Sequence, residues 1–135
     1  MKKNINRKYI DSNVFIQAIL REDINSQNIL KKIVDNEFEG VTSVLSWDEL
    51  VFILRKFISS EFAIIEGKKF LMFPNLKFID AKKEIVKKAQ SLIENYNIKP
   101  RDAIHSATAI SLNIKEIISN DSDFDKVKEL KRISP

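Results

Sequence analysis

The sequence predicts an α/β fold in which helices pack on both faces of a central, mostly parallel sheet of four to five strands. Two observations support this. Short apolar runs alternate along the 135 residues with longer segments whose apolar side chains recur at helical spacing. This alternation is typical of parallel sheets, because a crossover helix must join two parallel neighbours. The length and the 44% hydrophobic content suit one packed core, so residues 1–135 are expected to form a single domain.

The first half of the chain is predicted to contain two strands and three helices. Residues 8–10 are mostly apolar and indicate a buried strand. Helices are expected over residues 14–22 and 25–36, the second with apolar side chains on one helical face. Residues 40–43 form a second strand candidate, and the pattern of residues 45–59 predicts a long amphipathic helix.

The second half repeats this alternation. A helix over residues 60–72 follows after a break, and the apolar residues 76–79 are predicted as a strand. Residues 81–96 indicate a helix with lysines on one side, and residues 101–112 a helix that begins directly after Pro100. Two more apolar runs are predicted as strands: residues 116–119 and 131–133.

Four acidic residues stand where charge is not expected in such a fold. Asp11 follows the first strand directly, and Asp121 ends the fourth. Glu49 lies beside the apolar stripe of its helix, and Asp102 opens a helix rich in alanine and isoleucine. The loops at the carboxyl ends of parallel strands build the functional site of α/β folds, so these four side chains are expected to converge there.

Each acid taken alone also has a structural interpretation. Asp11 can cap a helix, the helix dipole favours Asp102 in a first turn, and Glu49 can face water. Converging carboxylates, however, repel one another and are tolerated mainly where a cation neutralises them. Their oxygens suit Mg²⁺ or Mn²⁺, and the chain has no cysteine and one histidine for softer metals. Such a site suits phosphodiester hydrolysis, whereas a metal-independent ribonuclease needs two groups that titrate near neutrality.

The amino-acid composition excludes several kinds of site and bears on the protein's location and partners. Without cysteine the chain has no disulfide, no cysteine-ligated zinc and no cysteine nucleophile, which fits a reducing, cytoplasmic setting. The N-terminus lacks the apolar run of a signal peptide, and no apolar stretch of about 18 residues predicts a membrane helix. The formal net charge of +4 is compatible with a nucleic acid partner, although many lysine-rich domains bind none.

Four segments around the acidic residues form a recognisable set: residues 9–15 (YIDSNVF), 43–50 (SVLSWDEL), 101–109 (RDAIHSATA) and 117–124 (IISNDSDF). Together they resemble the PIN domain, a family of metal-dependent ribonucleases. The resemblance covers nearly the whole chain and implies a PIN-like three-layer α/β/α sandwich. The family often has threonine after its first aspartate and in its last motif, where this chain keeps a hydroxyl with Ser12 and Ser119.

The resemblance also implies roles for the acidic residues. Asp11 and Asp102 would be the principal ligands of Mg²⁺ or Mn²⁺. Glu49 and Asp121 would complete the catalytic pocket, through the ion, its waters or a second ion. Asp123 is either a fifth carboxylate close to this site or, on the slightly preferred interpretation, the cap of a turn.

Neighbouring polar residues are expected to support these carboxylates. Ser12, Asn13 and Ser119 would hold them in place by hydrogen bonds. Lys99 and Arg101 flank Asp102 in the sequence and are candidates for contacts with RNA phosphates. Other residues have two open interpretations, of which packing or solvation is preferred over a role at the substrate: His105, Trp47 and the lysine pairs at 82–83 and 87–88.

Small PIN proteins without further modules are often VapC-type toxins of type II toxin–antitoxin pairs, and this layout resembles theirs. The resemblance implies a homodimer that cuts structured RNA, such as transfer or ribosomal RNA, and that a small antitoxin blocks. A free-standing RNA-processing nuclease and a non-catalytic RNA- or protein-binding PIN domain remain as alternatives. Unrelated Asp-dependent folds fit poorly: a haloacid-dehalogenase-like phosphatase needs a second aspartate where this chain has Asn13, and a receiver domain's acidic pair and lysine are not evident.

Overall fold

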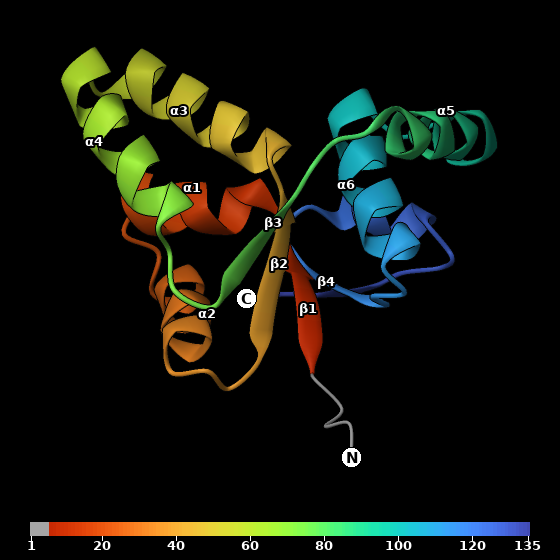
Figure 1. Cartoon of the computed structure of the whole chain (residues 1–135), viewed down its shortest axis with the longest axis horizontal. Coiled ribbons are helices and arrows are strands. Elements are labelled where there is room, and N and C mark those ends of the chain that lie inside the picture. Colours follow the sequence, from red (N-terminus) through yellow and green to blue (C-terminus); the bar gives the residue numbers. More distant parts are fainter. Residues whose placement is uncertain (1–5) are drawn as a thin grey trace.

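A computed structural model describes residues 6–135, in which six α-helices flank a central sheet of five strands (Figure 1). All neighbouring strands run parallel, so the predicted α/β class and sheet are confirmed. The strands are β1 (Arg7–Ile10), β2 (Glu39–Ser43), β3 (Leu76–Ile79), β4 (Glu116–Ile118) and β5 (Lys131–Ile133), in the spatial order β3-β2-β1-β4-β5.

Each predicted helix is present, with its ends moved by at most two residues. The first begins early because Asp11 has an extended backbone and its carbonyl accepts from the amide of Val14 at 3.1 Å. Pro100 occupies the first turn of its helix, where a missing N–H costs nothing. The helices are α1 (Ser12–Leu20), α2 (Ile24–Val34), α3 (Leu45–Phe57), α4 (Ser60–Leu71), α5 (Lys83–Tyr96) and α6 (Pro100–Ser111).

The helices form two layers, with α1 to α4 on one face of the sheet and α5 and α6 on the other (Figure 1). Each central strand contributes apolar side chains to the cores under both helical layers, because successive side chains of a strand point to opposite faces of the sheet. Tyr9 and Ile117 are buried in the core under α5 and α6, whereas Ile10 and Ile118 belong to the core under α1 to α4. The predicted three-layer sandwich is therefore present.

The sheet order reverses at β1, which has β2 on one side and β4 on the other. The carboxyl ends of β1 and β4 consequently lie next to each other, and the amide of Asp11 donates to the carbonyl of Ile118 at 3.0 Å. Such a reversal opens a crevice in α/β sheets, where ligands bind. Within residues 6–135, no helix is both long enough and apolar enough to cross a membrane.

Candidate active site

The four predicted acidic residues line one cavity of about 240 Å³ at this edge of the sheet. Asp11 is the first residue after β1, and Asp121 lies just beyond β4. Glu49 comes from the start of α3 on one face, and Asp102 from the first turn of α6 on the other. Residues from four segments that are distant in sequence thus meet because parallel strands end at the same edge.

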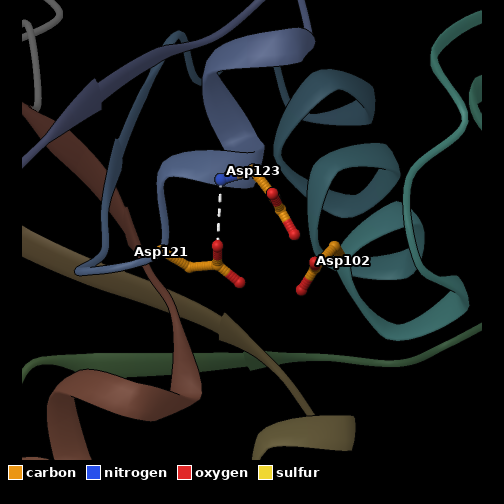
Figure 2. A group of neighbouring side chains, drawn as sticks. All are labelled: Asp102, Asp121 and Asp123. Carbon is orange, nitrogen blue, oxygen red and sulfur yellow. Dashed lines mark hydrogen bonds between the residues drawn. The ribbon is translucent and has the colours of Figure 1, made fainter.

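The tightest acidic group contains Asp102, Asp121 and Asp123, each of which offers a carboxylate oxygen within 4.8 Å of the other two. Figure 2 shows the three side chains turned toward one another. Asp11 and Glu49 are not part of this tightest group and instead line the adjoining wall of the cavity.

Asp123 belongs to a short 3₁₀-helix, η1 (Ser122–Lys126), that the sequence pattern did not predict. Its own amide donates to Oδ1 of Asp121 at 2.9 Å, so Asp121 is the residue that caps this turn (Figure 2). The preferred interpretation of Asp123 as the cap was therefore wrong. The turn leaves the Asp123 carboxylate beside Asp102, which is the alternative that the sequence had left open.

Ser119 joins the two acids that follow the central strands. Its hydroxyl donates to Oδ2 of Asp11 at 2.7 Å and accepts from the amide of Asp121 at 2.9 Å. The amide group of Asn13 donates to the same hydroxyl at 3.3 Å, whereas Ser12 reaches Asp11 only at 3.5 Å. Ser119 and Asn13 thus form the network around Asp11, and the Ser12 contact is too long to add much.

Gathering the acids disfavours their ionised forms. The pKa of Asp102 is raised to about 6, mainly by burial and then by the charges of Asp121 and Asp11, while His105 opposes the shift. Burial also raises the pKa of Asp11, against the opposing effects of His105 and Ser119. One oxygen of Asp102, Oδ2, is buried without a hydrogen-bond partner among residues 6–135. The neighbouring groups of residues 6–135 therefore do not fully offset the cost of ionising Asp11 and Asp102.

His105 is buried in α6, and both of its ring nitrogens have partners. Nε2 lies 2.6 Å from Oε1 of Glu49 and 3.8 Å from Oδ1 of Asp11, and Nδ1 lies 2.6 Å from the hydroxyl of Tyr9. Both ring nitrogens thus have hydrogen-bonding partners, and the partner of Nε2, Glu49, lines the acidic cavity. Tyr9 was not singled out from the sequence, because a tyrosine inside an apolar strand gives no signal beyond burial.

The rim of the site carries two exposed cationic side chains. Lys99 and Arg101 line a second hollow of about 470 Å³ that shares Glu49, Asp102 and Asp121 with the first. Lys99 Nζ lies 4.0 Å from a carboxylate oxygen of Asp123, and its side chain remains 78% exposed. Both cations are therefore free to meet a phosphate that approaches the acids.

The other residues with two interpretations lie away from the acids. Trp47 in α3 packs toward α4, where its Nε1 lies 3.2 Å from the position that a Cβ on Gly67 would occupy. It does not line either hollow of the acidic site. The lysine pairs are exposed at the start of α5 and along its outer side: Lys82, Lys83, Lys87 and Lys88.

Ser119→Ala is expected to lower the free energy of unfolding by about 1–3 kcal/mol, because it leaves a buried carboxylate oxygen and an amide without their partner. Urea denaturation measures the change. Ser106→Ala is the matched control, since Ser106 is also buried but its hydroxyl has no partner within residues 6–135. The control should keep or gain stability, and an equal loss in both variants would contradict the role given to Ser119.

Sequence comparison identifies relatives over nearly the whole chain. The sequence pattern of the PIN domain family matches residues 8–130. Ribonuclease VapC2 of Methanocaldococcus jannaschii is 24% identical, with 98% of this chain and 97% of that protein covered.

Structural comparison finds the same architecture. VapBC2 of Rickettsia felis, described as bound to a DNA fragment from its promoter, superposes with a TM-score of 0.76 at 20% identity, over 95% of this chain and 98% of its own. VapC20 of Mycobacterium tuberculosis, described as a toxin that cleaves the Sarcin-Ricin loop, gives 0.74 at 11% identity, over 90% and 95%. At these identities the likeness concerns the fold.

Proposed function

Because this chain belongs to the PIN domain family, we propose that it is an endoribonuclease that hydrolyses RNA phosphodiester bonds with Mg²⁺ or Mn²⁺. The observation that carries the proposal is the convergence of Asp11, Glu49, Asp102 and Asp121 on one cavity. The similarity to a protein named as a ribonuclease supports the substrate class. The proposal treats the whole chain as one catalytic domain.

The residues at the cavity fit a hard divalent cation. The tight group of Asp102, Asp121 and Asp123 offers only carboxylate oxygens, which are the donors that Mg²⁺ and Mn²⁺ prefer. The buried Oδ2 of Asp102 has lone pairs that no group within residues 6–135 satisfies. Burial and the charges of Asp121 and Asp11 raise the pKa of Asp102, and a bound cation would favour its ionised form.

We assign the principal metal ligands to Asp11 and Asp102, and the rest of the acidic pocket to Glu49 and Asp121, with Asp123 within reach. When bound, the cation supplies charge neutralisation, a more acidic water and polarisation of a phosphoryl oxygen. The protein's own contribution is orientation, because the Ser119 hydroxyl donates to Oδ2 of Asp11 and holds this carboxylate in place.

Lys99 and Arg101 are proposed to bind the RNA backbone. Both are exposed at the rim and line the hollow that leads to the acids. Their charges would hold a phosphate close to the carboxylates without reading the base, so they contribute affinity rather than sequence preference.

We further propose that the protein is the toxin of a toxin–antitoxin pair and acts on structured RNA in the cytoplasm, such as transfer or ribosomal RNA. The similar structures support this, since they include VapBC complexes and a toxin named for cleaving the Sarcin-Ricin loop. A small antitoxin would bind this chain and block the site.

A homodimer is part of the same proposal. Several large apolar side chains are exposed on α3 and α4 and next to their ends, and soluble proteins usually cover contiguous apolar surface with a partner. These exposed side chains are Val44, Trp47, Phe57, Ile58, Ile64, Ile65, Leu71 and Met72.

The direct test incubates the purified protein with single-stranded and structured RNA in Mg²⁺, in Mn²⁺ and in excess EDTA. Cleavage that leaves 5′-phosphate ends is expected with either metal, and EDTA should remove it because the uncompensated carboxylates repel the phosphate. Cleavage that persists in EDTA would refute the metal mechanism. Binding without cleavage under every condition would favour a non-catalytic PIN domain.

A further inference from the structure

We infer that His105 is a positioning residue that fixes Glu49 at the acidic site through a buried hydrogen-bond chain anchored by Tyr9. This inference rests on the proposed metal-dependent function and adds to it a residue outside the four acids. The chain runs from the backbone of β2 through Tyr9 and His105 to Glu49, so it connects the sheet with α6 and α3.

The direction of each hydrogen bond follows from its fixed donors. The amide of Ser43 donates to the hydroxyl of Tyr9 at 3.0 Å, so this hydroxyl keeps its own proton free to donate. The hydroxyl lies 2.6 Å from Nδ1 of His105, and this nitrogen accepts the phenol's proton when the ring is neutral and its hydrogen is on Nε2.

The other side of the ring is fixed by the carboxylate. A carboxylate offers only acceptors, so Nε2 of His105 carries a hydrogen and donates it to Oε1 of Glu49 at 2.6 Å. This bond occupies Oε1 and leaves Oε2 as the oxygen available to a ligand in the cavity. The arrangement matches a general device of metal sites, in which a partner of the ligand sets its orientation.

Simple burial does not account for the whole arrangement. The ring is 1% exposed, whereas the Glu49 side chain is 15% exposed and lines both hollows of the site. If His105 were needed only for packing, backbone groups could satisfy the hydrogen bonds of its ring nitrogens. Here the ring joins a strand residue to a side chain of the opposite helical layer, and Nε2 also lies 3.8 Å from Asp11.

Nitrogen NMR tests the chain without any substitution. His105 is the one histidine of the sequence, so protein without a polyhistidine tag gives a single set of imidazole signals. A long-range ¹H–¹⁵N spectrum distinguishes protonated from unprotonated ring nitrogens. Nε2 should be protonated and its hydrogen protected from exchange, and a ring protonated only at Nδ1 would overturn the inference.

Metal affinity provides the second readout. His105→Leu should weaken Mn²⁺ binding, measured by titration of free Mn²⁺, by about 10-fold or more. His105→Gln should retain most of the affinity, because its side-chain amide can still donate toward Glu49, and Tyr9→Phe should fall between the two. Thr108→Val is the control, since Thr108 is buried in the same helix and its hydroxyl donates to the carbonyl of Ile104, away from Glu49.

Circular dichroism establishes that each variant is folded before its affinity is compared. Wild-type affinity in folded His105→Leu would overturn the inference while leaving the proposed function intact. Absence of Mn²⁺ binding by the unaltered protein would instead refute the proposed function and this inference with it.

Discussion

Asp102→Asn is expected to lower RNA cleavage by about a thousandfold or more, because loss of a metal ligand removes several kcal/mol of transition-state stabilisation. The amide keeps the shape of the side chain and can donate to the neighbouring Asp121 or Asp123, so the fold should persist. Initial rates of cleavage at saturating Mg²⁺ measure the effect.

Asp80→Asn is the matched control for this variant. Asp80 also directly follows a strand, β3, at the same edge of the sheet, but it is exposed and does not line the cavity. It should cleave RNA as fast as the unaltered protein. Full activity in Asp102→Asn would remove this residue from the metal site, and equal losses in both variants would point to a general charge effect.

Asp102→Asn should also raise the free energy of unfolding of the metal-free protein at neutral pH. The folded-state pKa of Asp102 is about 6, above its ordinary value of 3.8, so the folded state favours the protonated form. Protonated Asp102 contributes fully to the free energy of unfolding below pH 3.8, and this contribution is lost as the pH rises through 6. Wild type and variant should therefore agree at low pH, and at pH 7 the variant should be more stable by about 1 kcal/mol after solvent screening. Urea denaturation in EDTA at several pH values measures this, and a constant difference would contradict it.

Mg²⁺ or Mn²⁺ is expected to raise the melting temperature of the protein by roughly 10 °C at a hundred times its dissociation constant, since such binding adds about 2.7 kcal/mol. The reason is that burial, together with repulsion between neighbouring carboxylates, disfavours the ionised acids, and a cation relieves this cost only in the folded state. Thermal denaturation followed by circular dichroism gives the shift.

The control for this shift is KCl at matched ionic strength, which screens surface charge without occupying the site. Asp102→Asn should lose most of the gain from the divalent ion. A rise in KCl equal to that in Mg²⁺, or an undiminished rise in the variant, would show that the stabilisation arises elsewhere.

The positions of the four acids could be predicted because each is tied to a strand end or helix start that the apolar pattern reveals. Asp11 follows β1, Asp121 follows β4, and Asp102 opens α6 after Pro100. Parallel topology then brings such positions to one edge without further information.

Other parts of the site could not be predicted, for physical reasons. The five residues of η1 are too few to show a period, so the turn that places Asp123 beside Asp102 was missed. Tyr9 and His105 are 96 residues apart, and His105 and Glu49 are 56 apart. Only the tertiary packing of both layers brings these partners together, and no local pattern records it.

The balance of charge at the cavity couples its two proposed ligands. Five carboxylates gather here, and an RNA phosphodiester would carry the same sign. The cations beside them within residues 6–135 are Lys99 and Arg101 at the rim and Lys126 next to Asp123. Each ligand must then improve the affinity for the other, and thermodynamic reciprocity makes the two factors equal. RNA affinity measured in a chelator, and Mn²⁺ affinity measured without RNA, will therefore both understate the strength of the ternary complex by the same free energy.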